Sequence, residues 1–492
     1  MINLKKVVLQ LSETHYQGLQ DQFQKNRAEK YCFLMHYYRE TELNDHQILE
    51  KLALNNAAYY TLKSRLSEKV QQYLFEHVKD PRIELMRNVS NIHNLLYNSP
   101  KATSIAILKK LEKKLMELDM PNELILVYHA LKKLHLSSPK HYEYTQLYNK
   151  HVAYTLGLDK AEDLLSKFVK KTSEYLISRE ESIIEVLLLM KAQMENVFKL
   201  YESHHLAIYK NIMNISFALF IPEQEPDEDE ESVEAMLKAS FKILDENPKD
   251  LNYNYLRTVF DFLSFEYYHG LNLYKNASPY FENVNDQMDS FLLADHCCCV
   301  TSFLPSKVER YVKLGIADRL VEENRSLFSG FETEDLPNYV FLAMYKASSF
   351  FYAFDYQKAI STLNELQSSI GFKNILHTEL EVKLFLALNY SMMNQYEQAD
   401  IIIKSVSRKL AERGEEDYES AQIFVKILKL QMSSELKDIE HKISALYDQF
   451  IDQNKGKNKI LRFLKFDKPF ISELSRFIKR APAVKVNRGA SV

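Results

Sequence analysis

The residues that could bind a metal or react chemically are concentrated in two short motifs. His296-Cys297-Cys298-Cys299 offers imidazole and thiolate groups, which are common zinc ligands. On a helix, however, consecutive side chains diverge by about 100° each, and the chain has no Cys-x-x-Cys interval to supply a second ligand pair. The same divergence is expected to separate His204 from His205. The sequence therefore predicts no metal site, and it predicts buried cysteines that behave as small apolar residues.

Other motifs for catalysis or cofactor binding are also lacking. Gly456-Lys457 lacks the upstream Gly and the following Ser or Thr of a phosphate-binding loop. The acidic run Asp227–Glu231 lacks the alternate spacing and the Gly of a calcium loop. We therefore expect a protein that is not an enzyme and that uses no cofactor.

The composition favours an all-α chain. With 9 Gly, 12 Pro and no Trp in 492 residues, turn-forming residues are scarce, and the periodic apolar segments are long, as in helices. No apolar run approaches the roughly 20 residues that span a bilayer, so we expect no transmembrane segment. Three of the four cysteines are consecutive, which is unlike a disulfide framework and favours a cytoplasmic location.

Two predicted helical hairpins repeat the same residue types at a regular interval along the chain. Aligning Phe341–Leu366 with Glu381–Val406 places small and aromatic residues at the same helical positions, followed by a short polar turn that ends in Tyr. The aligned pairs are Ala347 with Ala387, Phe350 with Tyr390, Tyr356 with Tyr396, Ala359 with Ala399, and Leu363 with Ile403. A degenerate third copy follows at the same interval, with Ile427, Leu430, Leu436, Ile439 and Ile443.

This pattern resembles the tetratricopeptide repeat. The resemblance implies a right-handed α-solenoid of antiparallel helical hairpins, used as a scaffold that binds other proteins. The repeat of about 40 residues is longer than the usual 34, and Gly371 and Ala411 stand where the closing Pro is expected. We extend the expectation of a solenoid from the two clear copies to most of the chain.

Composition and pattern divide the chain into five regions. They are an N-terminal helical region (1–79), a helical region with degenerate repeats (80–220), an acidic linker (221–231), a solenoid of tetratricopeptide-like hairpins (232–453) and a basic amphipathic tail (454–492). Within the second region we expect helices at Lys109–Leu118, Glu123–Leu136 and His141–Tyr154, a hairpin through Leu158–Leu165, and a long apolar run over Ile183–Phe220.

The N-terminal region contains a helix pair that resembles a helix-turn-helix. Asn44–Leu54 and Ala57–Leu74 are the two predicted helices, and Asn44 is a suitable cap for the first. In a DNA-binding protein, Lys63 and Arg65 would be the candidate contacts. The second helix begins with apolar and aromatic residues, and Ala53 replaces the favoured Gly of the turn. We therefore favour an ordinary hairpin that caps the solenoid, with nucleic acid as a less favoured partner.

The repeat alignment predicts a groove for a partner, because the first helix of each repeat lines the concave side in this family. The candidate lining residues are Phe341, Met344, Ser348, Phe351, Tyr352, Glu381, Leu384, Leu388, Ser391, Met392, Ala421, Phe424, Leu428, Gln431 and Met432. This apolar, Met-rich surface lacks the cations that clamp a peptide carboxylate, and it suits a helical or apolar peptide.

The basic tail offers a candidate occupant. Phe470, Ile471, Leu474, Phe477 and Ile478 share one apolar helical face, and Ile460–Phe466 alternates apolar with basic residues. Three uses remain open: packing on the protein's own solenoid, peripheral contact with an anionic membrane, or contact with nucleic acid or an acidic partner.

The leading hypothesis is a non-catalytic scaffold or adaptor for protein–protein interaction, binding a protein or peptide in the groove. One alternative is a transcription regulator with an N-terminal helix-turn-helix and a repeat region for sensing or oligomerisation. The other is an adaptor that attaches to a membrane surface through the basic tail.

Overall fold

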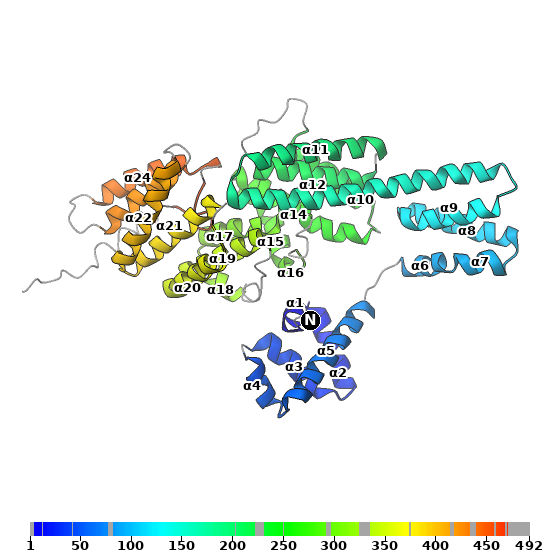
Figure 1. The fold of residues 1–492 in the computed structure, drawn as a ribbon, viewed down its shortest axis with the longest axis horizontal. Helices are drawn as coiled ribbons and strands as arrows, with labels where there is room; N and C mark the ends of the chain where they lie inside the picture. The colour runs from blue at the N-terminus through cyan, green and yellow to red at the C-terminus, as the bar shows by residue number, and fades with distance from the viewer. Residues whose placement is uncertain are drawn as a thin grey trace, which may run out of the picture.

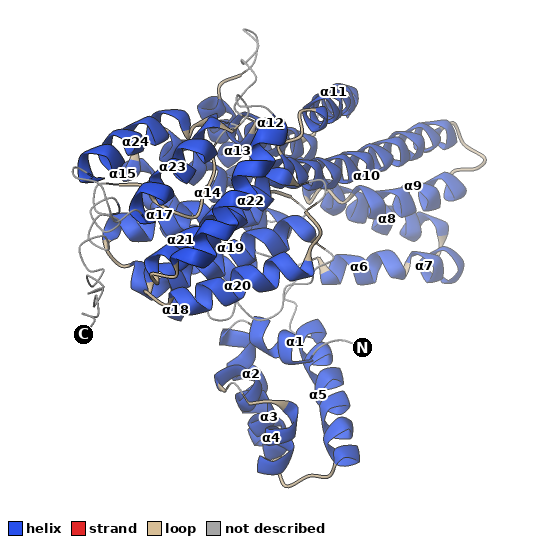
Figure 2. Ribbon diagram, turned by 60° about the vertical axis from the view of Figure 1, so that its left-hand side comes forward, coloured by secondary structure: helices blue, strands red, loops and turns tan. Residues whose placement is uncertain are grey.

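The computed structural model describes residues 4–11, 13–41, 43–76, 82–201, 203–221, 231–248, 250–291, 297–323, 335–372, 375–413, 418–432, 439–456, 459–467 and 470. Every regular element in these ranges is a helix, and they contain no strand (Figure 2). The prediction of an all-α protein is confirmed. In the same ranges, no helix combines the length and the apolar character that crossing a membrane requires. Most of the predicted acidic linker (221–231) lies outside the described residues.

Five N-terminal helices enclose a core of their own (Figure 1). They are α1 (Leu4–Gln10), α2 (Glu13–Lys25), α3 (Glu29–Glu40), α4 (Asp45–Lys51) and α5 (Asn56–Glu76). The predicted helix pair corresponds to α4 and α5. The side chain of Asn44 accepts a hydrogen bond from the Gln47 amide at 2.9 Å, so the predicted cap is confirmed.

Four helices and the start of a fifth form a second core. They are α6 (Ile83–Ser90), α7 (Ile92–Asn98), α8 (Lys101–Glu117), α9 (Pro121–Leu134) and the first turns of α10 (Lys140–Ser178). The later turns of α10 belong to the main core instead. This 39-residue helix therefore connects the second core to the body of the protein, as Figure 1 shows.

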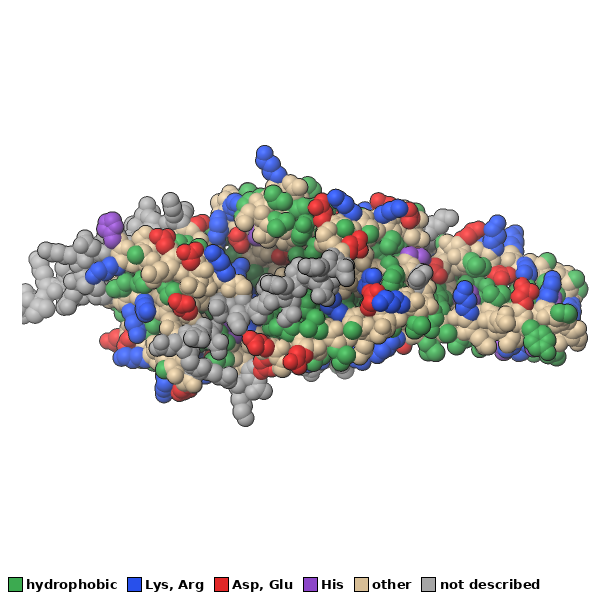
Figure 3. Space-filling view, turned by 90° about the horizontal axis from the view of Figure 1, so that it is seen from above, with side chains coloured by type: hydrophobic (Ala, Val, Ile, Leu, Met, Phe, Trp, Pro, Cys, Tyr) green, Lys and Arg blue, Asp and Glu red, His purple; other side chains and the backbone are tan. Residues whose placement is uncertain are grey.

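The main body extends from the second half of α10 to the C-terminal segment. Its remaining helices are α11 (Ser182–Tyr201), α12 (His204–Phe220), α13 (Val233–Glu246), α14 (Leu251–Gly270), α15 (Tyr274–Asp286), α16 (Met288–Phe291), α17 (Phe303–Leu314), α18 (Leu320–Glu323), α19 (Leu336–Tyr352), α20 (Tyr356–Ser369), α21 (Leu376–Met392), α22 (Tyr396–Arg413), α23 (Glu419–Met432) and α24 (Ile439–Gln453). Helices that are adjacent in sequence make the most extensive contacts. On the face drawn in Figure 3, acidic and basic side chains are interspersed.

The predicted repeat spacing is visible in the helix bounds. Helix α19 begins at Leu336 and α21 begins at Leu376, while their partners α20 and α22 begin at Tyr356 and Tyr396. Both helices of the first hairpin therefore recur in the second at the same interval. Helices α21 and α23 also end at corresponding positions, Met392 and Met432. The helices of these hairpins thus begin at one regular interval, although α22, with 18 residues, is longer than α20, with 14.

The hairpins share one turn geometry. In seven described turns a residue with positive φ follows the helix, and the amide of the next residue donates to the carbonyl five residues before it. This is the Schellman arrangement, which satisfies carbonyls at a helix C-terminus and favours Gly. The residues with positive φ are Arg27, Ala53, Asp119, Asn272, Gly315, Phe354 and Asn394. Only one is Gly, so a Gly-poor chain builds these turns from residues that carry a steric cost.

The region between residues 80 and 220 differs from the predicted elements. The expected helix at His141–Tyr154 and the hairpin through Leu158–Leu165 form parts of one continuous helix, α10. Gly157 lies within α10, and a Cβ atom there would be 2.6 Å from the ring of Tyr201. Gly157 is therefore not a turn residue; it permits close packing of α10 against the end of α11.

Ala53 allows the cost of a left-handed turn to be measured. Its φ is 49°, and its side chain is exposed, so packing does not complicate the result. We expect Ala53→Gly to raise the free energy of unfolding of the N-terminal core by about 1 kcal/mol, because Gly adopts this conformation without a Cβ clash. Ala53→Val should lower it, since a branched side chain is disfavoured there. Urea denaturation followed by circular dichroism tests both, and equal stabilities would contradict the assignment.

Candidate functional site

The chain's own C-terminal segment packs on residues that the sequence assigned to a groove. We define this segment as residues 459–467 with Phe470. The Ser348 hydroxyl donates to the Phe463 carbonyl at 2.6 Å, and the Lys465 amide donates to the Tyr352 hydroxyl at 2.8 Å. Both bonds connect a groove side chain to the main chain of the segment. Such bonds hold a peptide backbone irrespective of its side chains.

Aromatic side chains of the segment pack on the groove. The ring centroids of Phe341 and Phe463 are 5.8 Å apart, and those of Phe424 and Phe466 are also 5.8 Å apart. Phe470 lies 6.2 Å from Phe351 by the same measure. These separations are typical of favourable aromatic pairs. The segment is therefore part of the main apolar core.

The other predicted groove residues lie in the same core. The buried ones are Met344, Leu384, Leu388, Ser391, Met392, Ala421, Leu428 and Gln431, and Met432 is partly buried. Residues 459–467 contain turns and no helical residue, whereas the helix predicted from Phe470 to Ile478 lies, apart from Phe470, outside the described residues. Leu461 has a φ of 55°, which no helix tolerates in its interior. The part of the segment that contacts the predicted groove residues is thus non-helical over 459–467.

A buried ion pair fixes the segment in register. Arg462 donates to Glu381 from Nε (3.3 Å to Oε1) and from Nη2 (2.9 Å to Oε2), and the Arg462 amide donates to Oε1 at 3.2 Å. Glu381 is only 1% exposed. Burial acts to raise the pKa of Glu381, but the charge and hydrogen bonds of Arg462 outweigh it and lower the pKa to about 2. The carboxylate therefore stays ionised inside the core.

His377 lies beside this ion pair. Its Nε2 is 3.7 Å from Glu381 Oε2, and neither ring nitrogen has a hydrogen-bond partner among the described residues. Burial, together with the cations Arg462 and Arg179, lowers the pKa of His377 to about 3, despite the opposing effect of Glu381. The imidazole is therefore neutral over the physiological pH range.

Most of the predicted tail face, namely Ile471, Leu474, Phe477 and Ile478, lies outside the described residues. Phe470, the first member of that face, is 7% exposed and packs on Phe351 and Phe466. The alternation of apolar and basic residues from Ile460 to Phe466 was the sequence signal for the segment, but it did not identify Arg462 as the anchor.

The candidate DNA contacts lie on α5 of the N-terminal core. Lys63 Nζ is 2.9 Å from Asp45 Oδ2, while Arg65 is exposed. Tyr59, near the start of α5, is buried, and its hydroxyl is 3.0 Å from that of Tyr38. The start of α5 therefore packs in the N-terminal core.

The cysteine motif is buried in the main body. Cys297, Cys298 and Cys299 are each at most 5% exposed. Cys299 Sγ donates to the Val169 carbonyl at 3.7 Å, and burial raises the pKa of its thiol to about 12. These cysteines do not belong to any metal-ligand cluster among the described residues. His296 lies outside those residues.

The arrangement of His204 and His205 differs from the sequence prediction, which was that their side chains point in different directions. They occupy the first turn of α12, with ring centroids 4.3 Å apart, and both approach Asp119 Oδ2. Burial acts to lower the pKa of His205, but hydrogen bonds to Asp119 and Asp250 outweigh it and raise the pKa to about 9. Burial likewise acts to raise the pKa of Asp119, and its bonds to both histidines hold it well below the usual range. The angular separation along the helix did not prevent convergence, because imidazole rings can turn about the Cα–Cβ bond.

Comparisons with protein families, curated proteins and solved structures found no match for this chain. Its function must therefore be argued from the chemistry of these sites.

Removal of the buried carboxylate should release the C-terminal segment. Glu381→Gln leaves the Arg462 cation without its counter-charge in the core, and breaking a buried pair in this way costs about 3–5 kcal/mol. We expect a lower free energy of unfolding and faster hydrogen exchange at residues 460–466. Combining Glu381→Gln with Arg462→Met should recover much of the lost free energy of unfolding. The exposed Glu397 provides the control variant, Glu397→Gln, and an equal effect there would refute the role of the ion pair.

Acid should destabilise the same region through His377. Its pKa is lower in the folded state than in the unfolded state, so the unfolded chain takes up the proton first. The stabilisation is therefore complete above about pH 6.5 and is lost as the pH falls towards 3, by roughly 3–5 kcal/mol. Denaturation at a series of pH values should show that the free energy of unfolding changes less steeply with pH in His377→Gln than in the exposed-residue control His93→Gln. Identical slopes would contradict this prediction.

Proposed function

We propose that this protein is a non-catalytic interaction scaffold whose groove binds an extended apolar–basic segment of a partner protein. The C-terminal segment is the resting occupant of that groove. The observation that carries the proposal is the seating of a non-helical stretch of chain by main-chain hydrogen bonds to Ser348 and Tyr352. A partner segment of the same length can use the same bonds, because they do not depend on its side chains.

Side-chain contacts define the partner's chemistry. Arg462 pairs with the buried Glu381 carboxylate, and Phe463 and Phe466 contact aromatic residues of the groove. The matching motif is therefore an arginine followed by aromatic residues at the next and the fourth positions. Arginine suits this site better than lysine, since its planar fork bonds both carboxylate oxygens.

Covalent attachment gives the resting occupant an advantage over a partner. Helix α24 ends at Gln453, so only a short connection precedes the segment, and the effective concentration of a tethered ligand is on the order of millimolar. A partner segment can enter the groove only if it outcompetes the tethered C-terminal segment. The groove is therefore self-occluded until a stronger segment displaces the C-terminal one.

The proposal also includes a tetratricopeptide-like α-solenoid as the scaffold. Support comes from the helix bounds, which recur at one interval from the first hairpin to the second, and from the shared turns at Phe354 and Asn394. The turn at Asn272 supports it further, since the Tyr274 hydroxyl donates to Asn272 Oδ1 as the Tyr396 hydroxyl donates to Asn394 Oδ1. Stacked hairpins of this kind build extended binding surfaces.

Exchange of the segment in trans tests the proposal. A specific protease site inserted between Lys457 and Asn458 allows the segment to be cut from its tether in the full-length protein. We expect a fluorescent peptide of residues 459–470 to bind the cut protein saturably, measured by anisotropy, and not to bind the uncut protein. A peptide with Arg462→Ala should bind at least about tenfold more weakly, because it leaves Glu381 unpaired.

Lys465 supplies the matched control. Its Nζ lies 3.3 Å from Asp467 within the segment, so Lys465→Ala removes a cation without touching the groove carboxylate. That peptide should bind nearly as well as the original. If the cut protein does not exchange its segment, or unfolds when the segment leaves, the segment is a fixed part of the core and the proposal fails.

A further inference from the structure

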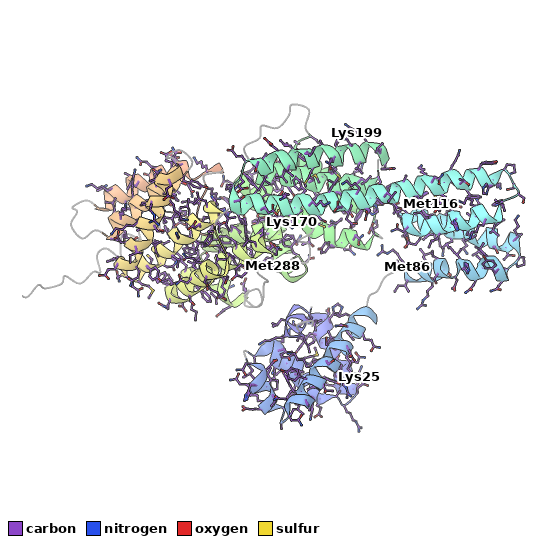
Figure 4. All side chains as sticks on the ribbon, viewed as in Figure 1. Lys25, Met86, Met116, Lys170, Lys199 and Met288 are labelled. Atoms are coloured by element: carbon purple, nitrogen blue, oxygen red, sulfur yellow. The ribbon has the colours of Figure 1, made fainter. Side chains whose placement is uncertain are left out.

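A second site lies where the second core meets the main body. A cavity of about 1100 Å³ is lined by side chains that include Met116, Lys150, His151 and Lys199. Figure 4 labels Met116 on α8 and Lys199 near the end of α11. Asp119, from the α8–α9 turn of the second core, meets His204 and Asp250 of the main body in the wall of this cavity.

Three potential metal ligands converge in that wall. Asp119 Oδ2 lies 3.1 Å from His204 Nε2 and 2.8 Å from His205 Nδ1. The three ligand atoms all lie within 4.8 Å of one another. Ligand atoms in a tetrahedral zinc site with bonds of 2.0–2.1 Å are roughly 3.3 Å apart. Small side-chain rotations therefore suffice to place all three around a single ion.

Each histidine is also oriented from its far side. His204 Nδ1 is hydrogen-bonded to the Tyr253 hydroxyl, and His205 Nε2 lies 2.8 Å from Asp250 Oδ2. Metal-binding histidines in proteins nearly always have such a partner on the second nitrogen, which fixes the tautomer and the ring plane. The Tyr154 hydroxyl donates to Asp119 Oδ2 at 3.2 Å and orients the carboxylate as well. An outer shell is thus present for all three candidate ligands.

A different helix end positions each part of this site. Asp119 has a φ of 43° and is the left-handed residue of the α8–α9 turn, so its carboxylate projects from the end of the second core. Ser203 caps α12, since its hydroxyl accepts from the Leu206 amide at 3.2 Å, and this places both histidines in the first turn. Asp250 caps α14 through the Asn252 amide. Three helix ends therefore converge on one point.

We propose that Asp119, His204 and His205 bind a divalent first-row transition-metal ion, with Zn²⁺ as the best fit to two imidazoles and one carboxylate. Three protein ligands leave a coordination position open towards the cavity, where water or a small ligand completes the shell. Bound metal joins the second core to the main body.

Direct metal binding tests this proposal. The purified full-length protein is stripped with a chelator, dialysed and titrated with Zn²⁺ alone, with uptake measured by plasma mass spectrometry and affinity by calorimetry. We expect stoichiometric binding of one ion per chain. Substituting Co²⁺ should give the visible absorption of a nitrogen–oxygen site of low coordination number. Absence of Zn²⁺ uptake and of Co²⁺ absorption by the wild-type protein would overturn the proposal, whatever the variants do.

Variants distinguish ligands from supporting residues. His204→Gln and Asp119→Asn should abolish stoichiometric binding. Asp250→Asn and Tyr253→Phe should retain it with an affinity about 10- to 100-fold lower, as outer-shell changes do. His93 is exposed on α7 of the second core, and the control His93→Gln should bind as the wild type does. Circular dichroism verifies folding, and binding that survives both ligand variants would refute the site.

Discussion

The ionised carboxylate of Glu381 imposes the strongest constraint on the C-terminal half of the molecule. A buried charge without a partner is very unfavourable, so α21 can pack in the core only if a cation reaches this point. Arg462 supplies that cation with both its guanidinium and its amide. The position of Arg462 then determines where Phe463 and Phe466 enter the core, and the C-terminal segment is threaded between α19, α21 and α23. One ion pair thus couples the last described residues to three helices.

In the proposed scaffold, the same constraint gives the groove its selectivity. An apolar trough by itself accepts many hydrophobic peptides, whereas a buried carboxylate penalises every ligand that lacks an arginine at one position. The hydroxyls of Ser348 and Tyr352 are hydrogen-bonded to the main chain of the C-terminal segment, and these bonds set its direction and register. The features that stabilise the resting state are therefore those that would discriminate among partners. The proposed scaffold function and the self-occlusion have a common physical origin.

Helix ends organise other parts of the molecule in a comparable way. Because the chain is poor in Gly, left-handed turn positions are occupied by residues such as Asp119, Asn272 and Asn394, which carry polar side chains. A polar residue at such a turn satisfies the helix end and also projects a functional group from it. At Asp119 this group meets two histidines and a second carboxylate from other helix ends. The residue that ends the turn after α8 thereby also brings a carboxylate to the other candidate metal ligands.

The sequence by itself determined the helical class, the cap at Asn44 and the regular recurrence of the hairpin pairs, because apolar periodicity and capping are local properties. It also placed Ser348 and Glu381 among the residues expected to line a groove, but it did not distinguish them from the other candidates. It did not predict that α10 runs unbroken past Gly157, where the absence of a Cβ leaves room for the ring of Tyr201. Only the tertiary structure paired Arg462 with Glu381, 81 residues away, and His205 with Asp119, 86 residues away. Contacts at such separations depend on how whole helices pack, and no pattern within a single segment records them.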